Sequence, residues 1–296
     1  MVRVSGVTFI KGAFRLGYPV LESIQSIAPF CDEVVINVGF DDPSLTQDDG
    51  TYQYLRDHLT AEKFVFLKNW WDPQLSAKGL VLSQQTNIAL AKARGKFAQY
   101  IQADEAIHQD DYSLIEQGIK KLIDNPRVQG LVYQYHHFYG DPYVERRTRL
   151  TYRREVRMIR LEHGIKSHLD AQGFLHQDGS KLLCFETAAR VFHYGWARSY
   201  QAMVQKIEQM NKLYHGQDFH TPRTFEYRNI WGLKTYKGTH PAVMMDWIEK
   251  NRLGRDLLSE PLVYQSGDWR LYLSDTVERL IGYRLGEYKN FKLCKI

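Results

Sequence analysis

The sequence has few cysteines, and none of them is close to another. Cys31, Cys184 and Cys294 are the only three in 296 residues, and no two have the CxxC spacing of a zinc knuckle or a redox site. An odd, dispersed set does not form a disulfide framework, which fits a reducing compartment. We therefore expect a cytoplasmic protein without structural zinc or disulfides.

Long apolar runs are also missing. No stretch approaches the roughly 20 apolar residues that a membrane-spanning helix needs. The N-terminal segment MVRVSGVTFIKGAF has too short an apolar run for a signal peptide. Peripheral contact with the inner face of a membrane stays open.

Several catalytic and nucleotide-binding motifs do not occur. The sequence has no P-loop GxxxxGK[ST], no GxSxG nucleophile elbow and no HExxH metal motif. No GxGxxG follows the first expected strand, which weakens a dinucleotide-binding interpretation.

Charge of one sign is scarce except in one segment. With 39 Lys and Arg against 34 Asp and Glu, the net charge is +5, which is mild for this length and argues against a nucleic-acid-binding protein. The segment 146–160 (RRTRLTYRREVRMIR) has seven Arg and one Glu, so the remaining 281 residues sum to −1. Because guanidinium groups bind phosphate bidentately, this segment is interpreted as an anion-binding or acceptor-side surface. A solvated edge strand is the alternative.

Apolar patterning predicts alternating strands and helices over the first 105 residues. The alternation of Val2–Ile10 indicates a strand, and Tyr18–Ile27 has apolar residues at helical spacing. The pattern continues with elements at Val34–Val38, Tyr52–Leu59, Phe64–Leu67, Ser83–Ala93 and Phe97–Gln102. This order predicts an α/β fold with a mixed, mostly parallel sheet and helices on both faces. Ligands bind such sheets beyond the carboxyl ends of the strands.

The pattern changes near residue 195. Before that point we expect a helix at Asp111–Ile123 and strands at Val128–Tyr135, Val156–Arg160 and Ala189–Tyr194. After it, Tyr200–Tyr214 has an apolar helical stripe of Met203, Ile207, Met210 and Tyr214. We predict an α/β domain over residues 1–195 and a mainly helical C-terminal extension over 196–296.

Two acidic residues follow the strand expected at Phe97–Gln102. Asp104 and Glu105 would lie at the ligand edge of the sheet, where carboxylates can hold a divalent cation that binds phosphate oxygens. A helix-capping acidic pair would have the same sequence, so both interpretations stay open.

Three further segments contain candidate site residues. His193 follows another expected strand and is a candidate metal ligand, although a hydrogen-bonded structural histidine is more common. Asp170, in SHLDAQGF, is a candidate general base or an ordinary turn residue. The loop Gly39–Thr51 has four Asp residues and suits either ligand contact or a solvated turn.

Taken in order, several segments resemble the family 2 glycosyltransferases of the GT-A fold, in a bacterial-type branch. They are VSGVTFIKGA, YPVLESIQSI, CDEVVINVG, DDGT, SQQTNIALAKARGKFAQYIQADEAIH, YRREVRMIR, HLDAQGF, FHYGWAR and YKGTHPAVM, which together cover residues 4 to about 245. The resemblance implies a GT-A catalytic domain with a donor half of about 1–105 and an acceptor half of about 106–195.

The resemblance also implies the reaction. A nucleotide-sugar donor, with UDP, GDP or dTDP as its nucleotide, would give its sugar to a saccharide or lipid-linked saccharide with inversion at the anomeric carbon. The cofactor implied is Mn²⁺ or Mg²⁺, and the process is surface polysaccharide or glycan synthesis.

Site residues follow from the resemblance by position. The family's Asp-x-Asp motif falls on Gln102-Ala103-Asp104, so Gln102 replaces the first acid and Asp104 is the implied metal ligand. Glu105 and His193 are implied as further ligands, and Asp170 as the base that deprotonates the acceptor. The implied donor-binding residues are Thr8, Phe9, Lys11, Gly39, Asp41, Asp49, Asn87, Gln102, Ala103 and Asp104.

Two other functions compete with sugar transfer. The Gln102 replacement gives weight to a nucleotide-sugar-binding relative without catalysis. A nucleotidyltransferase of the same fold would need a Gly- and Arg-rich loop after the first strand, of which FIKGAFRLG is a poor version.

Overall fold

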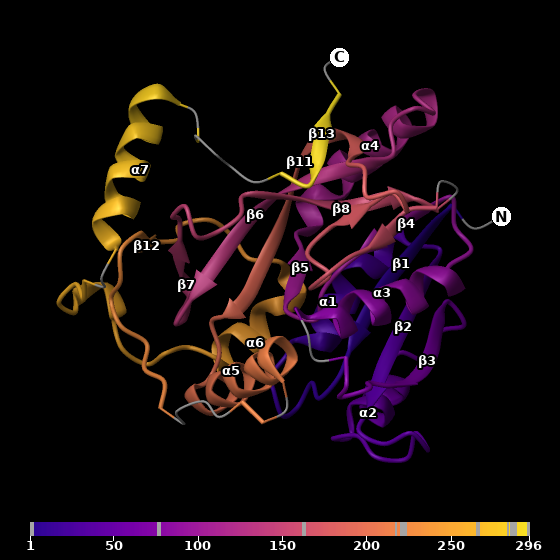
Figure 1. Cartoon of the computed structure of the whole chain (residues 1–296), viewed down its shortest axis with the longest axis horizontal. Helices are drawn as coiled ribbons and strands as arrows, with labels where there is room; N and C mark the ends of the chain where they lie inside the picture. Colours follow the sequence, from indigo (N-terminus) through magenta and orange to yellow (C-terminus); the bar gives the residue numbers. More distant parts are fainter. Residues whose placement is uncertain are drawn as a thin grey trace.

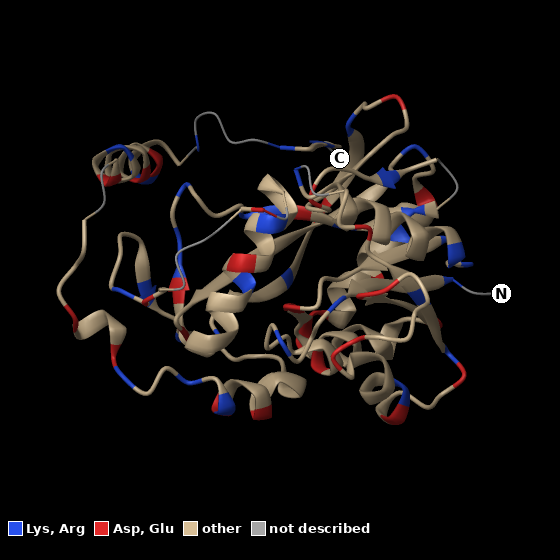
Figure 2. Ribbon diagram, turned by 60° about the horizontal axis from the view of Figure 1, so that its bottom comes forward, with Lys and Arg blue, Asp and Glu red and all other residues tan. Residues whose placement is uncertain are grey.

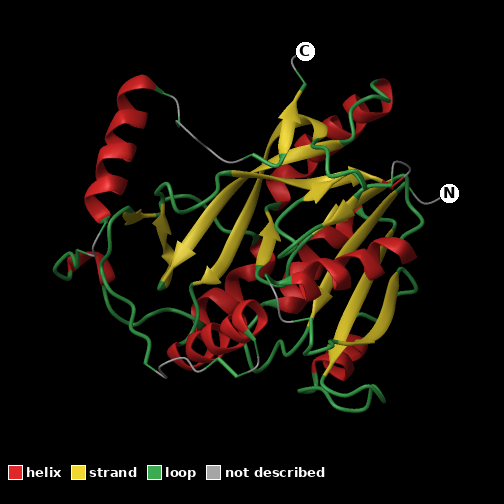
Figure 3. Ribbon diagram, viewed as in Figure 1, coloured by secondary structure: helices red, strands yellow, loops and turns green. Residues whose placement is uncertain are grey.

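The computed structural model describes residues 3–75, 78–161, 164–216, 218–219, 224–264, 267–282, 284 and 289–294. Within these residues the strands form an eleven-stranded mixed sheet and a small two-stranded one. Helices pack against the large sheet (Figures 1 and 3). The predicted α/β class, with a mixed sheet flanked by helices, is confirmed.

The N-terminal part builds the parallel region of the sheet. Its strands lie in the order β3-β2-β1-β4, and each neighbouring pair is parallel. The elements are β1 (Val4–Ile10), α1 (Val20–Ile27), β2 (Glu33–Phe40), α2 (Thr51–His58), β3 (Phe64–Trp70), α3 (Leu80–Lys92) and β4 (Phe97–Tyr100). The predicted alternation of strands and helices is therefore correct, with Val2 outside the described residues.

Local sequence explains these elements. Every residue of β2 is buried, as expected for a continuous apolar run that is covered on both faces. Helix α3 begins after Gly79, whose φ of +68° suits glycine. The helix predicted to begin at Ser83 begins three residues earlier, at Leu80, and the Ser83 hydroxyl donates to the Leu80 carbonyl at 3.0 Å within it.

The middle of the chain adds antiparallel strands. Strand β6 pairs antiparallel with β7 and β8 and parallel with β11, and β8 pairs antiparallel with β4. The elements are β5 (Glu105–Ile107), α4 (Tyr112–Asp124), β6 (Gly130–Tyr139), β7 (Asp141–Arg146), β8 (Arg154–Arg160), β9 (Lys166–Ser167), β10 (Phe174–Leu175) and β11 (Leu182–Trp196).

The region after residue 195 contributes both helices and strands. Strand β12 pairs with β7, and β13 pairs with β11, so this region shares the large sheet. Its elements are α5 (Tyr200–His215), β12 (Leu233–Thr235), α6 (Met245–Lys250), α7 (Asp268–Ile281) and β13 (Phe291–Leu293). Helix α7 lies at one edge of the molecule (Figure 1). The boundary at 195 stays a prediction, and it falls within β11.

Four short 3₁₀ helices complete the described elements: Ala28–Phe30, Gln109–Asp111, Ala242–Met244 and Leu257–Ser259. Among the described residues, no helix combines the length and apolarity needed to cross a membrane.

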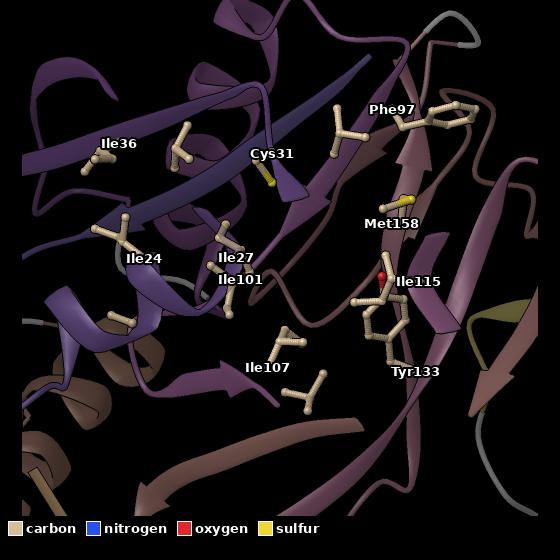
Figure 4. Packing of buried hydrophobic residues seen from close by; sticks show 14 of the residues in the cluster. Ile24, Ile27, Cys31, Ile36, Phe97, Ile101, Ile107, Ile115, Tyr133 and Met158 are labelled. Carbon is tan, nitrogen blue, oxygen red and sulfur yellow. The ribbon is translucent and has the colours of Figure 1, made fainter. Parts of the chain in front are cut away.

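Two apolar clusters pack against the sheet. One gathers Ile24 and Ile27 of α1 with Ile115 of α4, as Figure 4 shows. The other contains Ala89 and Leu90 of α3. Helices on both faces therefore fix the positions of the strands. Residues at the strand ends are consequently held in defined positions.

Several arginines of the segment 146–160 are buried or paired with other groups of the protein. Arg157 is fully buried, and Arg160 donates to the Leu122 carbonyl in the last turn of α4 and to the Val128 carbonyl beyond it, the latter at 2.8 Å. Arg154 pairs with Glu186 at 3.0 Å, and Arg153 pairs with Glu278. Basic and acidic segments are interspersed along the ribbon (Figure 2). The interpretation as an anion-binding surface is therefore wrong for the buried Arg157 and Arg160, and for Arg153 and Arg154 it stays a prediction.

Candidate active site

A cavity of about 540 Å³ lies beyond the carboxyl ends of β1, β3 and β4. Phe9, Ile10 and Lys11 reach it from the end of β1, and Trp71 from the end of β3. Residues from Met203 to Tyr214 of α5 line another wall, so a helix from beyond residue 195 covers the strand ends. This is the edge where open α/β sheets bind ligands.

Seven of the predicted site residues line this cavity. They are Phe9, Lys11, Gln102, Ala103, Asp104, Asp170 and His193. The structure brings them together from β1, from the segment after β4, from the loop before β10 and from β11. The other predicted residues, Thr8, Gly39, Asp41, Asp49, Asn87 and Glu105, lie outside the lining.

Asp104 lies on the cavity wall in contact with two cations. Its Oδ2 atom accepts hydrogen bonds from Arg198 Nη2 at 2.9 Å and from Lys206 Nζ at 3.1 Å. Burial alone would raise the pKa of Asp104, but the positive charges of Lys206 and Arg198 outweigh it and hold the pKa below its usual range. The carboxylate is therefore ionised and already neutralised by protein groups.

Lys206 comes from α5 and points across to the sheet. Its ammonium donates to Asp104 and to the Gly195 carbonyl at 2.8 Å. Burial, with the positive charge of Arg198, lowers the pKa of Lys206 to about 8 despite the opposing effect of Asp104. Lys206 is thus charged near neutral pH and lies at the cavity surface.

His193 lies beside Asp104, but not in hydrogen-bond contact with it. Its Nε2 atom is 3.7 Å from Asp104 Oδ2, and its Nδ1 atom is 3.0 Å from Nδ1 of His137. The other nitrogen of His137 contacts the Tyr152 carbonyl at 2.7 Å. Burial lowers the pKa of His193 well below its usual value, so the ring is neutral.

Glu105 faces a different environment from its neighbour. Both oxygens bind the guanidinium of Arg157, at 2.7 and 3.0 Å, and Oε1 also accepts from Tyr135 at 2.7 Å. The side chains of Glu105 and Arg157 are both 0% exposed. The role of Glu105 as a metal ligand stays a prediction, and in this structure its oxygens are occupied by the buried pair.

These donors do not fit a divalent cation well. A magnesium or manganese site uses one or two carboxylates with phosphate oxygens, but Gln102 replaces one acid and Glu105 is committed elsewhere. Two cations already touch the oxygen of Asp104. Among the residues that the structure describes, no cluster of three His, Cys, Asp or Glu side chains is arranged to hold a metal.

Asp170 lies in a tight loop on the opposite part of the lining. Its Oδ2 atom accepts a hydrogen bond from the Tyr214 hydroxyl of α5 at 2.9 Å. Leu169 and Ala171 on either side have φ values of +50° and +61°, a region that non-glycine residues enter only at a cost. The loop is therefore held in a defined shape that presents Asp170 to the cavity.

Gln102 links this loop to the end of β4. Its Nε2 atom donates to the Tyr100 hydroxyl at 3.2 Å and to the Ala171 carbonyl at 3.4 Å. The residue that stands where the family has an acid thus connects the Asp104 and Asp170 segments.

The end of β1 supplies a cation and an aromatic wall. Lys11 Nζ is 3.0 Å from Asp41 Oδ1 and 5.8 Å from the centre of the Trp71 ring. Phe9 packs against the same ring, with centroids 5.8 Å apart. Among the described residues, the buried indole Nε1 of Trp71 has no hydrogen-bond partner, and it packs against the backbone at Gly39.

The packing of Trp71 accounts for a glycine at position 39, without a direct contact to a ligand. A Cβ at Gly39 would lie 2.3 Å from Trp71 Nε1, so only glycine lets the ring pack at the end of β2. Asp41 contributes indirectly, through its ion pair with Lys11.

Three other residues that were predicted to bind the donor are instead buried or hydrogen-bonded to the backbone in this structure. Thr8 is fully buried in β1, and Asp49 accepts from the Arg15 backbone N–H at 2.9 Å. Asn87 of α3 accepts from Ser167 N at 2.8 Å and donates to Ser167 O at 3.0 Å. Asn87 therefore holds the strand that precedes the Asp170 loop.

Sequence reasoning missed Lys206, Arg198, Tyr18 and Trp71. The apolar stripe of α5 was visible, and Met203, Ile207, Met210 and Tyr214 do share one side, which is the cavity wall. The signal that would have led to Lys206 is its place within this stripe, one residue before Ile207.

No protein-family model matches the chain, and no curated protein matches it. Among solved structures, a crystal structure of residues 1–349 of S. aureus TarS in complex with UDP resembles it at 13% identity, with a TM-score of 0.40. The match covers 71% of this chain and 65% of that one, so this chain spans less than two thirds of that structure. The crystal structure of S. aureus TarS matches at 14% identity and a TM-score of 0.38, over 71% of this chain and 40% of that one. At such identities and scores the likeness carries no conclusion about function.

Proposed function

We propose that this chain is an inverting glycosyltransferase that moves a sugar from a nucleotide-diphosphate sugar to a hydroxyl of a saccharide or lipid-linked saccharide. The observation that carries the proposal is the shared cavity. Asp104 and Asp170 are distant in sequence, yet both line it, together with Lys11 and Lys206. An ionised carboxylate and fixed positive charges in one cavity are what this transfer requires.

The proposed reaction breaks one bond, forms another and needs a base for the acceptor proton. The bond between the anomeric carbon and the diphosphate oxygen breaks, and its electron pair leaves with the diphosphate. The acceptor oxygen forms its bond to the same carbon from the opposite face and gives its proton to a carboxylate. Asp170 is that carboxylate in our proposal, because it lines the cavity and Tyr214 fixes one of its oxygens.

The donor nucleotide belongs at the end of β1 in this proposal. Phe9 and Trp71 supply aromatic surfaces on which a base can pack. Lys11, which also lines the cavity, supplies a positive charge. UDP-, GDP- and dTDP-sugars are the candidate donors, and surface polysaccharide or glycan synthesis is the proposed process. The buried free thiols Cys31 and Cys184 favour a cytoplasmic location, where the enzyme would meet a lipid-linked acceptor at the inner membrane face.

Donor hydrolysis with the Asp170→Asn variant tests this function. Nucleotide sugars that raise the melting temperature of the protein are selected first, since ligands of the folded state stabilise it. The wild type should release nucleoside diphosphate slowly without acceptor. Water replaces the acceptor in this hydrolysis, so loss of a general base should lower the release of nucleoside diphosphate by roughly 10²- to 10⁴-fold and leave nucleotide affinity unchanged. Near-normal turnover in the variant would show that Asp170 is not the base.

A nucleotide-sugar-binding protein without catalysis is the second candidate. Gln102 in place of an acid and the prior neutralisation of Asp104 favour it. Such a protein would bind a nucleotide sugar in the same cavity but release no nucleoside diphosphate over hours. That result, with binding established, would replace the transferase proposal.

A further inference from the structure

A bound nucleotide diphosphate brings negative charge into the cavity, and more develops on it as the sugar leaves. A divalent cation is one way to meet that charge, and fixed ammonium or guanidinium groups are another. Both possibilities involve Asp104, because the carboxylate that would hold a divalent cation is also the group that contacts Arg198 and Lys206.

Two protein cations already bind Asp104, the residue expected to hold a metal. Arg198 and Lys206 both bind Oδ2 of Asp104, so this group of three carries a surplus of one positive charge. A divalent ion placed on Asp104 would be repelled by both. The other acid that could share it, Glu105, is tied to Arg157.

Arg198 is built into the scaffold behind Asp104. Its side chain is 0% exposed, and Nη1 donates to the Leu16 carbonyl at 2.5 Å. Its guanidinium lies 4.2 Å from the centre of the Tyr18 ring. This cation is therefore fixed in place before any ligand arrives.

Lys206 is the member of the group that reaches the cavity. Its side chain is 12% exposed and forms part of the lining. An ammonium has three N–H donors, and two of them bind Asp104 and the Gly195 carbonyl. Within the described part of the chain, the third donor has no hydrogen-bond partner and can therefore bind a ligand, and Asp104 orients it.

From this arrangement we infer that Lys206, held by Asp104 and supported by Arg198, binds the diphosphate of the donor in place of a divalent cation. The inference rests on the proposed function and specifies its donor site. The site takes a nucleoside diphosphate without metal. During transfer the Lys206 ammonium stabilises the oxygen that receives the electron pair of the broken glycosyl bond.

Calorimetric titration with UDP, GDP and dTDP tests the inference. Each nucleotide is added to the full chain in excess EDTA and, separately, in excess Mn²⁺. At least one should bind in EDTA, with an affinity within about threefold of that in Mn²⁺. Lys206→Met keeps the length of the side chain and removes its charge, so it should weaken binding about tenfold or more, which corresponds to 1.4 kcal/mol.

Two further variants control this measurement. Lys212→Met removes a charge from the same helix, where Lys212 pairs with Glu208 at 2.8 Å outside the cavity lining, and it should bind as the wild type does. Lys206→Arg keeps the charge and should restore part of the lost affinity. The comparison of EDTA with Mn²⁺ uses the wild type alone, so it holds even if Lys206→Met folds poorly.

The outcomes separate the inference from the function on which it rests. If a nucleotide binds only with Mn²⁺, the inference is wrong and the transferase proposal stands. If Lys206→Met binds in EDTA as tightly as the wild type, the inference is also wrong. If none of the three nucleotides binds under either condition, the proposed function fails and the inference falls with it.

Discussion

Asp104 and Glu105 are neighbours in sequence, yet one lies in a group with excess positive charge and the other in a charge-balanced pair. Behind the strand ends, Glu105 meets one cation, Arg157, and both are fully buried, so their charges cancel. On the cavity side, Asp104 meets two cations, Arg198 and Lys206, and one positive charge is left over. A balanced, closed pair belongs to the scaffold, whereas an unbalanced group at a cavity surface is suited to bind an anion.

The sharpest way to break the closed region is Glu105→Ala. Removing one partner of a buried pair leaves the other charge uncompensated, which costs about 3–5 kcal/mol. We expect the free energy of unfolding, measured with urea, to fall by this amount. Unchanged stability together with lost Mn²⁺ binding would instead return Glu105 to the role of a metal ligand.

A matched control uses a pair of the same chemistry at the surface. Arg154 and Glu186 are 3.0 Å apart, with side chains 23% and 35% exposed. Because exposed pairs contribute about 0–1 kcal/mol, Glu186→Ala should change stability far less than Glu105→Ala. Equal losses would mean that burial does not distinguish the two pairs.

A third carboxylate, Glu155, is buried with neutral partners. Its oxygens accept from Gln172 Nε2 at 2.7 Å and from Asn290 Nδ2 at 3.0 Å. Burial raises its pKa from 4.5 to about 7, against the opposing effect of Arg157. The folded state therefore binds a proton more tightly than the unfolded state does, and this contribution to stability is lost as pH rises from about 4.5 to 7.

Glu155→Gln should remove that pH dependence. At 1.36 kcal/mol per pKa unit, the wild type should lose up to about 3 kcal/mol more than the variant between pH 4.5 and pH 8. Urea unfolding of both proteins at the two pH values measures the difference. Parallel stability curves for the two proteins would contradict the raised pKa.

Apart from the surface control at Glu186, the smallest effect is expected at Asn87. Replacing it with Ala leaves the buried backbone N–H and C=O of Ser167 without their side-chain partner, which costs about 1–3 kcal/mol. Nucleotide affinity should stay close to that of the wild type, because Asn87 lies outside the cavity lining. Weakened nucleotide binding at unchanged stability would make Asn87 a donor-binding residue after all.

The parallel half of the fold could be predicted because its signals are local. Runs such as VVINV and the helical spacing of α1 depend only on neighbouring residues. The placement of Asp104 at a strand end followed from the same reasoning. The local sequence of Asp170 fits an ordinary turn as well as a general base, and the resemblance decided in favour of a site residue.

The cations of the site could not be predicted, because they depend on contacts between distant segments. Lys206 meets Asp104 across 102 residues, and Arg198 meets it across 94. The Arg-rich segment misled for the same reason, because its charge count does not reveal that Glu105, Glu186 and Glu278 balance it. Composition shows how much charge a segment has, and only the fold shows where it is neutralised.

The short strand β13 has a consequence for anyone who shortens this chain. Asn290, just before β13, packs so closely on Gly173 that a Cβ there would lie 1.7 Å from its Nδ2 atom, and that same atom donates to Glu155. Gly173 is three residues from Asp170. A fragment cut after α7 would therefore keep most of the cavity lining yet lose the contact that supports the loop of Asp170, so the last described residues belong to the folded unit that forms the cavity.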